Sequence, residues 1–187
     1  MRRLTALERV SVDGIFDAAQ MAVWDFPYDS EDRQAIIAGG IHGSDAYLLG
    51  RVTYEMLAPG WSACKNNEYG VADQLNRMKK YVVSSGLEQA TWNNSTIIRG
   101  EVAEEIGRLK EQAGGDILVH GSATLLQTLL AAGLVDELQL LVHPRVVGTG
   151  KRLFEDGVAA LTLELVESRS LDRGVVLLRY QPEQSGH

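Results

Sequence analysis

Three short segments of the chain place small and hydroxyl residues directly after an apolar run. They are Leu49–Thr53, Val83–Gly86 and His120–Thr124. Glycine lets a ligand approach the backbone, the free N–H groups of a helix N-terminus attract phosphate, and hydroxyls add hydrogen bonds. Ligands of α/β sheets bind at the carboxyl ends of the strands, so the three segments together predict a site for a nucleotide with more than one phosphate. Each segment alone is more typical of an ordinary turn than of a phosphate site.

Several familiar sites are missing from the sequence. It contains no G-x-G-x-x-G fingerprint, no phosphate-binding P-loop and no G-x-S-x-G nucleophile turn. His42, His143 and His187 show no paired metal-ligand spacing, and we predict no metal site. The sequence therefore argues against the usual Rossmann, ATPase and hydrolase sites.

Strands and helices alternate through the first two thirds of the sequence. Apolar runs predict strands at 3–10, 46–49, 80–83, 96–98 and 116–120, and apolar periodicity predicts helices after Asp29 or Ser30, at 52–57, 101–112 and 124–132. Pro59-Gly60 is expected to end the second helix. The last third holds three strands at 137–143, 161–170 and 175–180, the last two joined by a turn at 172–174. This order predicts an α/β fold with a mostly parallel central sheet and a C-terminal antiparallel hairpin.

Length and charge exclude other classes of protein. The 187 residues fit a single domain, 1–187, in which 181–187 are expected to form a frayed tail. A formal charge of −7 disfavours a nucleic-acid partner, and the single Cys64 excludes an internal disulfide. Glu8 and Arg9 interrupt any signal-peptide core, and no apolar run reaches the roughly 18 residues of a membrane span. We expect a cytoplasmic protein with no membrane partner.

Weak motifs spread in order over nearly the whole chain resemble the dihydrofolate-reductase-like superfamily. The motifs are Ser11–Gly14, Leu48–Glu55 with Trp61, Lys79–Ser84, Asp116–Ala123, Gly133–Leu138 and Pro144–Phe154. They are most similar to the branch of stand-alone bacterial proteins that resemble the C-terminal reductase domain of riboflavin-biosynthesis proteins. The resemblance implies a three-layer dihydrofolate-reductase-like fold and an NADPH-dependent oxidoreductase of the pyrimidine-reductase kind.

The resemblance also implies which residues bind the cofactor. It assigns the phosphates to Gly50, Arg51 and Thr53, the adenosine ribose and its 2′-phosphate to Ser84 and Ser85, and the pyrophosphate and nicotinamide to Gly121, Ser122, Ala123, Thr124 and Leu125. The guanidinium of Arg51 suits a 2′-phosphate because it can pair two phosphate oxygens. The alternative for Arg51 is a surface ion pair.

Candidates on the substrate side are Asp13, Asp29 and His120, any of which, or water, would deliver a proton. Each has a structural alternative: an Asp-Gly turn for Asp13, helix capping for Asp29 and its neighbour Asp32, and a hydrogen-bonded core position for His120. Dihydrofolate reductases hold their pteridine with an acidic residue near Asp29. Riboflavin-pathway reductases commonly place an acidic substrate ligand where this chain has His120.

Trp24 and Trp61 are candidates for the walls of the substrate pocket, with simple packing as the alternative.

The implied reaction transfers a hydride from NADPH to a C=N bond of a small heterocycle, a pteridine, a pyrimidine or a ribosylaminopyrimidine-like molecule. One alternative is a nucleotide-binding or regulatory module that has the same fold without reductase chemistry. A homodimer is a further hypothesis, with the apolar strands 138–142 and 175–178 as its interface unless they only fill the core.

Overall fold

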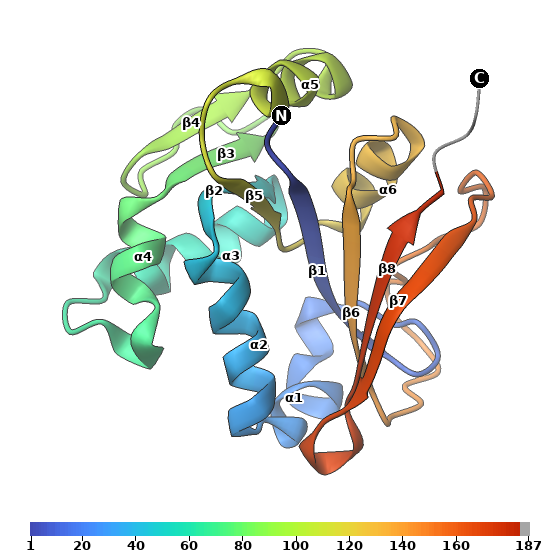
Figure 1. The fold of residues 1–187 in the computed structure, drawn as a ribbon. Coiled ribbons are helices and arrows are strands. Elements are labelled where there is room, and N and C mark those ends of the chain that lie inside the picture. The colour runs from blue at the N-terminus through green and yellow to red at the C-terminus, as the bar shows by residue number, and fades with distance from the viewer. Residues whose placement is uncertain (184–187) are drawn as a thin grey trace.

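A computed structural model of the chain describes residues 1–183, and a single eight-stranded sheet forms its centre (Figure 1). The strands follow the order β4-β3-β2-β5-β1-β6-β8-β7. Their bounds are β1 (Leu4–Ser11), β2 (Ser44–Gly50), β3 (Lys79–Val83), β4 (Ser95–Ile98), β5 (Asp116–Val119), β6 (Glu137–His143), β7 (Leu163–Ser170) and β8 (Val176–Pro182). Strands β1 to β6 run parallel, and β8 pairs antiparallel with both β6 and β7. The expected parallel sheet with a C-terminal antiparallel hairpin is confirmed.

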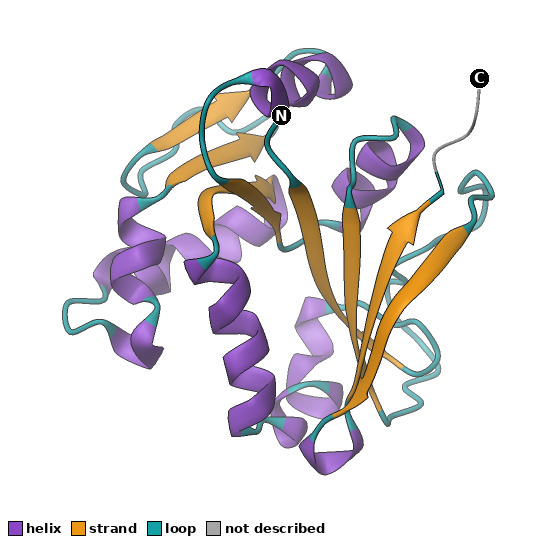
Figure 2. Cartoon of the chain, in the orientation of Figure 1, coloured by secondary structure: helices purple, strands orange, loops and turns teal. Residues whose placement is uncertain are grey.

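Helices cover both faces of the sheet and complete three layers (Figure 2). They are α1 (Met21–Trp24), α2 (Glu31–His42), α3 (Arg51–Ala63), α4 (Ala72–Arg77), α5 (Val102–Glu111) and α6 (Ala123–Ala131), with short 3₁₀ turns at Ala18–Gln20, Phe26–Tyr28, Glu68–Gly70 and Asp172–Gly174. Helices α2, α3 and α4 pack on one face, and α5 and α6 pack on the other. Two apolar cores therefore lie back to back across the sheet.

The buried strands explain why the core divides in this way. Ala46 to Leu49 of β2 are at most 2 % exposed, as expected for a parallel strand with both faces covered. In β1, Leu4, Ala6 and Val10 face α5 and α6, whereas Leu7 faces the other core. Because side chains alternate along a strand, Arg9 shares the face of Leu7.

Two local features differ from the sequence prediction. Helix α3 continues through Pro59 and Gly60 to Ala63, so the expected helix end at these residues is wrong. Tyr54 and Ala58 on α3 are buried in the core, and this packing outweighs the local cost of the proline. Helix α4 was not expected; Ala72 and Leu75 bury its apolar side.

The C-terminal strand is longer than the sequence indicates. Gln181 and Pro182 belong to β8 and pair with Glu164 and Leu163, so these two residues are ordered strand and not part of a frayed tail. Residues 184–187 of the expected tail lie outside the described residues.

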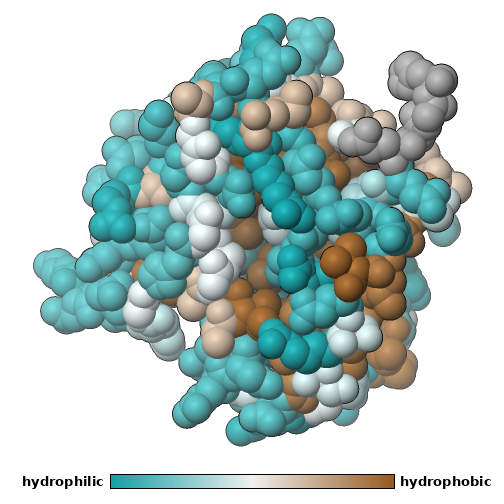
Figure 3. All heavy atoms as spheres, in the orientation of Figure 1, coloured by the Kyte–Doolittle hydropathy of each residue, from teal (hydrophilic) through white to brown (hydrophobic). Residues whose placement is uncertain are grey.

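The hairpin forms the exposed edge of the sheet. Leu165 and Val166 of β7 are about half exposed, and apolar surface gathers over β7 and β8 on the right of Figure 3. In the strands considered for a dimer interface, Leu138, Leu141, Val175 and Leu177 are buried in the cores of the chain itself.

No helix within residues 1–183 combines the length and the apolar character needed to cross a membrane.

Candidate active site

The three segments with small and hydroxyl residues follow three neighbouring strands. In the sheet, β2 lies between β3 and β5, with Gly50 opposite Val83 and Leu48 opposite Val119. The backbone N–H of Gly50 donates to the carbonyl of Gly121 at 3.3 Å. The fold thus brings the segments after β2, β3 and β5 to one edge of the sheet, where ligands of α/β proteins bind.

Two glycines at this edge are tightly enclosed. A Cβ atom on Gly50 would lie 2.4 Å from Ser122 Oγ and 2.9 Å from Ser122 Cβ. Gly121 has a φ of +69°, and a Cβ there would lie 2.8 Å from Thr53 Oγ1 and 3.1 Å from Phe16 Cζ. Side chains are excluded at both positions, so the backbones of the turns after β2 and β5 lie unusually close together. Within the turn after β5, the Gly121–Ser122 peptide bond is cis.

Two helices begin at this edge and direct their N-termini to it. Helix α3 starts at Arg51 directly after Gly50, and no side chain caps its first N–H groups. Helix α6 starts at Ala123, and the hydroxyl of Ser122 accepts from the N–H of Leu125 at 3.4 Å. Since N-terminal N–H groups carry partial positive charge, the two ends together favour an anionic ligand.

The hydroxyl side chains of this edge are engaged to different degrees. Ser84 is buried, and its Oγ accepts from the N–H groups of Gly86 and Leu87 at 3.2 and 2.9 Å. Thr53 is half-buried beside Gly121, whereas Ser85 and Thr124 are exposed. Among the expected cofactor residues, Ala123 and Leu125 are buried, so they offer their backbone only.

Two arginines, Arg51 and Arg99, lie at this edge, and Arg99 was not among the residues predicted from the sequence. Arg51 donates to Glu55 at 2.9 Å, and both side chains are about half exposed, so the surface ion pair left open for Arg51 is present. Arg99, directly after β4, donates to the carbonyls of Ser85 at 3.2 Å and Leu87 at 2.5 Å. An arginine directly after a strand beside a serine turn was the available signal for Arg99.

On the α2 face, His120 and Tyr47 form a hydrogen-bonded pair. The Tyr47 hydroxyl and His120 Nδ1 are 2.7 Å apart, and the rings meet edge to face. His120 Nε2 is buried and has no hydrogen-bond partner among the described residues. Burial, aided by the charge of Arg9, lowers the pKa of His120 to about 3. The imidazole is therefore neutral at physiological pH and does not act as a protonated acid.

Glu8 lies beneath the turn after β5. It is 2 % exposed, and its Oε1 accepts from the N–H of Gly121 at 2.8 Å. Burial raises the pKa of Glu8 to about 8, so its carboxyl carries a proton at neutral pH. This role of Glu8 was not predicted from the sequence, although a charged residue inside an apolar strand was a signal.

Asp13 joins two loops. Its carboxylate accepts from the Ser11 hydroxyl at 2.6 Å and from the N–H groups of Val147 and Gly148 at 3.1 and 2.8 Å. The Ser11 hydrogen bond, with help from the backbone N–H groups, lowers the pKa of Asp13 to about 2. Asp13 is therefore ionised and without a proton to donate, which favours the structural alternative.

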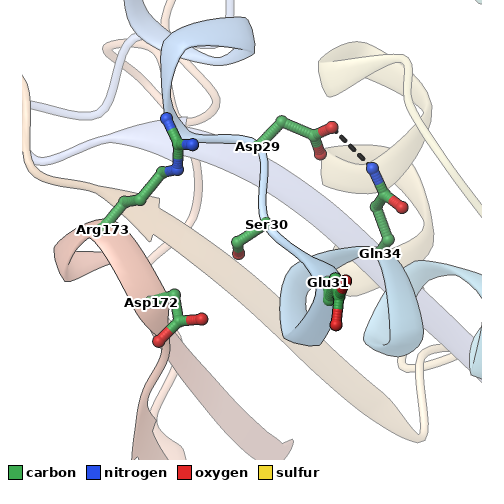
Figure 4. A pocket seen from close by; sticks show the side chains of 6 residues that line it. All are labelled: Asp29, Ser30, Glu31, Gln34, Asp172 and Arg173. Atoms are coloured by element: carbon green, nitrogen blue, oxygen red, sulfur yellow. Dashed lines mark hydrogen bonds between the residues drawn. The ribbon is translucent and has the colours of Figure 1, made fainter.

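Asp29 lies at the protein surface and is also engaged. It accepts from Arg33 at 2.9 Å and from Gln34 at 2.6 Å, and it lines an open hollow beside Arg173 (Figure 4). About half of its side chain is exposed. The neighbouring Asp32 lies in the first turn of α2 and accepts from the N–H groups of Arg33 and Asp172 at 2.7 and 2.8 Å, so it connects α2 to the turn at Asp172–Gly174. The N-cap of α2 is Ser30, and no side chain among the described residues caps the helix, so the capping expected of Asp29 and Asp32 is not present.

A buried ion cluster lies between Asp29 and the sheet. Asp25 has no exposed side-chain surface and contacts Arg9 at 3.0 Å, Arg33 at 2.5 Å and His143 at 3.2 Å. Burial alone would raise the pKa of Asp25, but the His143 hydrogen bond and the two guanidinium charges outweigh it and lower the pKa to about 2. This cluster was not predicted from the sequence.

The two tryptophans do not lie at the strand ends. Trp24 is 1 % exposed, donates to the carbonyl of Asp17 at 3.1 Å and packs its ring 5.4 Å from that of His143. Trp61 is ten residues beyond Arg51 on α3, about 15 Å along the helix axis. The positions of Trp24 and Trp61 fit the alternative interpretation, in which both side chains simply pack against the protein.

No cluster of three or more potential metal ligands occurs in the part of the chain that the structure describes.

Comparison with known proteins agrees with this arrangement. A family model described as the RibD C-terminal domain matches residues 2–177. The chain belongs to the RibD C-terminal domain family. A relative of this RibD C-terminal domain, the uncharacterized protein YyaP of Bacillus subtilis (strain 168), is 34 % identical over 140 residues, covering 73 % of each chain.

Solved structures share the fold at low identity. A putative riboflavin biosynthesis protein from Shewanella sp. PV-4 superposes with a TM-score of 0.77 at 16 % identity, covering 97 % of this chain and 99 % of its own. Dihydrofolate reductase from Enterococcus faecalis, complexed with NADP(H), superposes with a TM-score of 0.65 at 16 % identity over 97 % of each chain. This RibD C-terminal domain therefore has the dihydrofolate-reductase-like fold.

Proposed function

We propose that the protein is an NADPH-dependent reductase that transfers a hydride to a C=N bond of a small heterocycle, a pteridine, a pyrimidine or a ribosylaminopyrimidine-like molecule. The observation that carries the proposal is the meeting of two helix N-termini over Gly50 and Gly121, where side chains are excluded. Family membership and the fold shared with an NADP(H)-bound dihydrofolate reductase support it.

The residues at this edge fit a dinucleotide phosphate. The pyrophosphate would be held by the uncapped N-terminus of α3 with Thr53 and by the N-terminus of α6 with Ser122. Arg51, released from Glu55, and Ser85 would contact the ribose 2′-phosphate. When bound, NADPH supplies the hydride, and the protein supplies position and electrostatics.

The protonation states of the candidate side chains limit which group can deliver a proton to the substrate. Asp13 and Asp25 are ionised, with pKa values of about 2, and Asp29 is held by Arg33 and Gln34. His120 is neutral. These contacts and charge states disfavour Asp13, Asp29 and His120 as proton donors. We therefore propose that water delivers the proton to the substrate nitrogen while the hydride reduces the carbon.

Titration with NADPH and NADH, followed by thermal shift and nicotinamide fluorescence, tests the cofactor. Arg51→Ala is expected to weaken the binding of NADPH and to leave the binding of NADH unchanged. Arg108→Ala is the matched control, because Arg108 forms a comparable exposed ion pair with Glu105 on α5. No response at millimolar NADPH would overturn the proposal.

A second candidate, a nucleotide-binding module without reductase chemistry, is favoured by the engaged state of Asp13, Asp25 and Asp29. Oxidation of NADPH across a panel of pterins, dihydropyrimidines and aminouracils separates the two. NADPH binding without any oxidation would favour the module.

A further inference from the structure

His120 offers an unused hydrogen-bond donor. If Nδ1 donated to the Tyr47 hydroxyl, both the tyrosine proton and Nε2 would be buried without partners, because no other acceptor for that hydroxyl lies among the described residues. If the hydroxyl donates to Nδ1, only Nε2–H is left unpaired. Since each unpaired buried polar group costs free energy, the second arrangement is favoured. Tyr47 thereby holds the imidazole with an N–H at Nε2.

Arg9 is a second donor on the same face. Ala6 pairs with Val119, so His120 lies beside Leu7, and Arg9 is the next residue of β1 on that face. One third of the Arg9 side chain is exposed, and its ion pair with Asp25 engages Nη1. The charge of Arg9 is close enough to lower the pKa of His120.

Negative charge is neutralised around these two donors. Asp25 is shared between Arg9 and Arg33, and Asp29 is paired with Arg33. Glu8, on the opposite face of β1, is protonated at neutral pH because burial raises its pKa to about 8. The two carboxylates are balanced by the two guanidinium groups, so the face carries no excess negative charge. It differs in this from the acidic pteridine site that the resemblance implied, and it presents N–H donors.

We propose that this face selects a heterocycle that carries a carboxylate next to its reducible C=N bond, with His120 Nε2–H and the Arg9 guanidinium as donors to the carboxylate and Tyr47 as the positioning residue. This inference rests on the proposed function and specifies its substrate class. Charge-assisted hydrogen bonds to a carboxylate are stronger than those to a neutral carbonyl. The 2-amino group of a pterin is itself a hydrogen-bond donor, so its approach to the donors of His120 and Arg9 is disfavoured.

Matched ligand pairs test the proposal on the full chain. Pterin-6-carboxylate is compared with pterin, and quinoxaline-2-carboxylate with quinoxaline, by calorimetry with and without saturating NADPH. The carboxylate of at least one pair is expected to bind at least about tenfold more tightly than its neutral partner. Equal or undetectable binding of both members in both pairs overturns the inference, whereas absence of NADPH binding overturns the proposed function.

Variants assign the preference to the named residues. Arg9→Gln is expected to abolish the preference for the carboxylate and Arg9→Lys to retain part of it, which keeps the test informative if Arg9→Gln fails to fold. Tyr47→Phe is expected to reduce the preference and to change the His120 tautomer seen by heteronuclear NMR. Tyr69→Phe is the matched control, because Tyr69 is 83 % exposed. A wild-type His120 with its proton on Nδ1 would contradict the assignment.

Discussion

The edge after β2, β3 and β5 and the cluster around Asp25 place polar groups in opposite ways. The edge relies on backbone N–H groups and on glycines that exclude side chains. The cluster relies on long charged side chains from β1, α2 and the segment between α1 and α2, with His143 from β6.

Because of this difference, substitutions in the two regions should cost free energy of unfolding for different physical reasons. At the edge, the cost of a change is steric, because the backbones of two turns lie close together. In the cluster, the cost is electrostatic, because a buried carboxylate balances two guanidinium groups. Substitutions in the two regions should therefore differ in both size and kind.

The largest effect is expected for Asp25→Asn. It leaves the buried guanidinium of Arg33 and the partly buried one of Arg9 without their shared carboxylate, and breaking a buried pair typically costs about 3–5 kcal/mol. Urea unfolding measures the free energy. Asp29→Asn, at a half-exposed pair with Arg33, is the control and should cost about 1 kcal/mol or less. Similar costs for the two variants would remove the distinction between cluster and surface.

Gly50→Ala tests the steric character of the edge. The new Cβ would meet Ser122, including its backbone nitrogen at 3.1 Å, and overpacking of this kind costs about 1–3 kcal/mol. NADPH affinity should fall together with stability. Gly107→Ala in α5, where a Cβ meets nothing within 4 Å, should instead stabilise by up to about 1 kcal/mol. A tolerated Gly50→Ala would show that the turns are free to separate.

Glu8 connects the two kinds of region, since it is a buried carboxyl that supports the backbone of Gly121. Its pKa rises from 4.5 to about 8 on folding, so between these pH values the folded state holds a proton that the unfolded state has lost. Stability should therefore fall as the pH rises through this range, by up to about 1.4 kcal/mol per pH unit, and level off above it. Denaturation of Glu8→Gln across the same range should lack this slope. An unchanged slope in the variant would assign it to other groups.

The smallest effect is expected for Asp13→Asn. The amide keeps one oxygen for the N–H groups of Val147 and Gly148, so the loss should be about 1 kcal/mol. The pH profile of NADPH oxidation should keep its shape, because Asp13 is already ionised above its pKa of about 2. A variant that folds but cannot turn over would restore Asp13 as the proton donor.

The same contrast explains how much could be predicted from the sequence. Gly50, Gly121 and Ser122 are recognisable because small residues after an apolar run are a local signal, and strand order alone then brings them together. Asp25 and Arg33 lack such a signal. Asp25 lies outside every strand and helix that the sequence predicts, and its partners come from strands and a helix whose packing no local pattern specifies.

Tertiary packing also accounts for the differences in secondary structure. Helix α3 crosses Pro59 because Tyr54 and Ala58 bury one side of it, and α4 is stabilised by Leu75 and not by a long apolar repeat. The fold class depended on the order of many elements, so these local differences left it unchanged.

The central position of β1 has a consequence for the synthesis of the chain. Although β1 leaves the ribosome before the other strands of this sheet, its neighbours in the sheet are β5 and β6, whose pairing residues begin at Ile117 and Glu137. Strand β1 therefore lacks its pairing partners until β5 and β6 have been synthesised, and folding depends on contacts that are distant in sequence. During this interval, Glu8 and Arg9 interrupt the apolar strand with charge, and we expect this charge to oppose aggregation of the nascent chain.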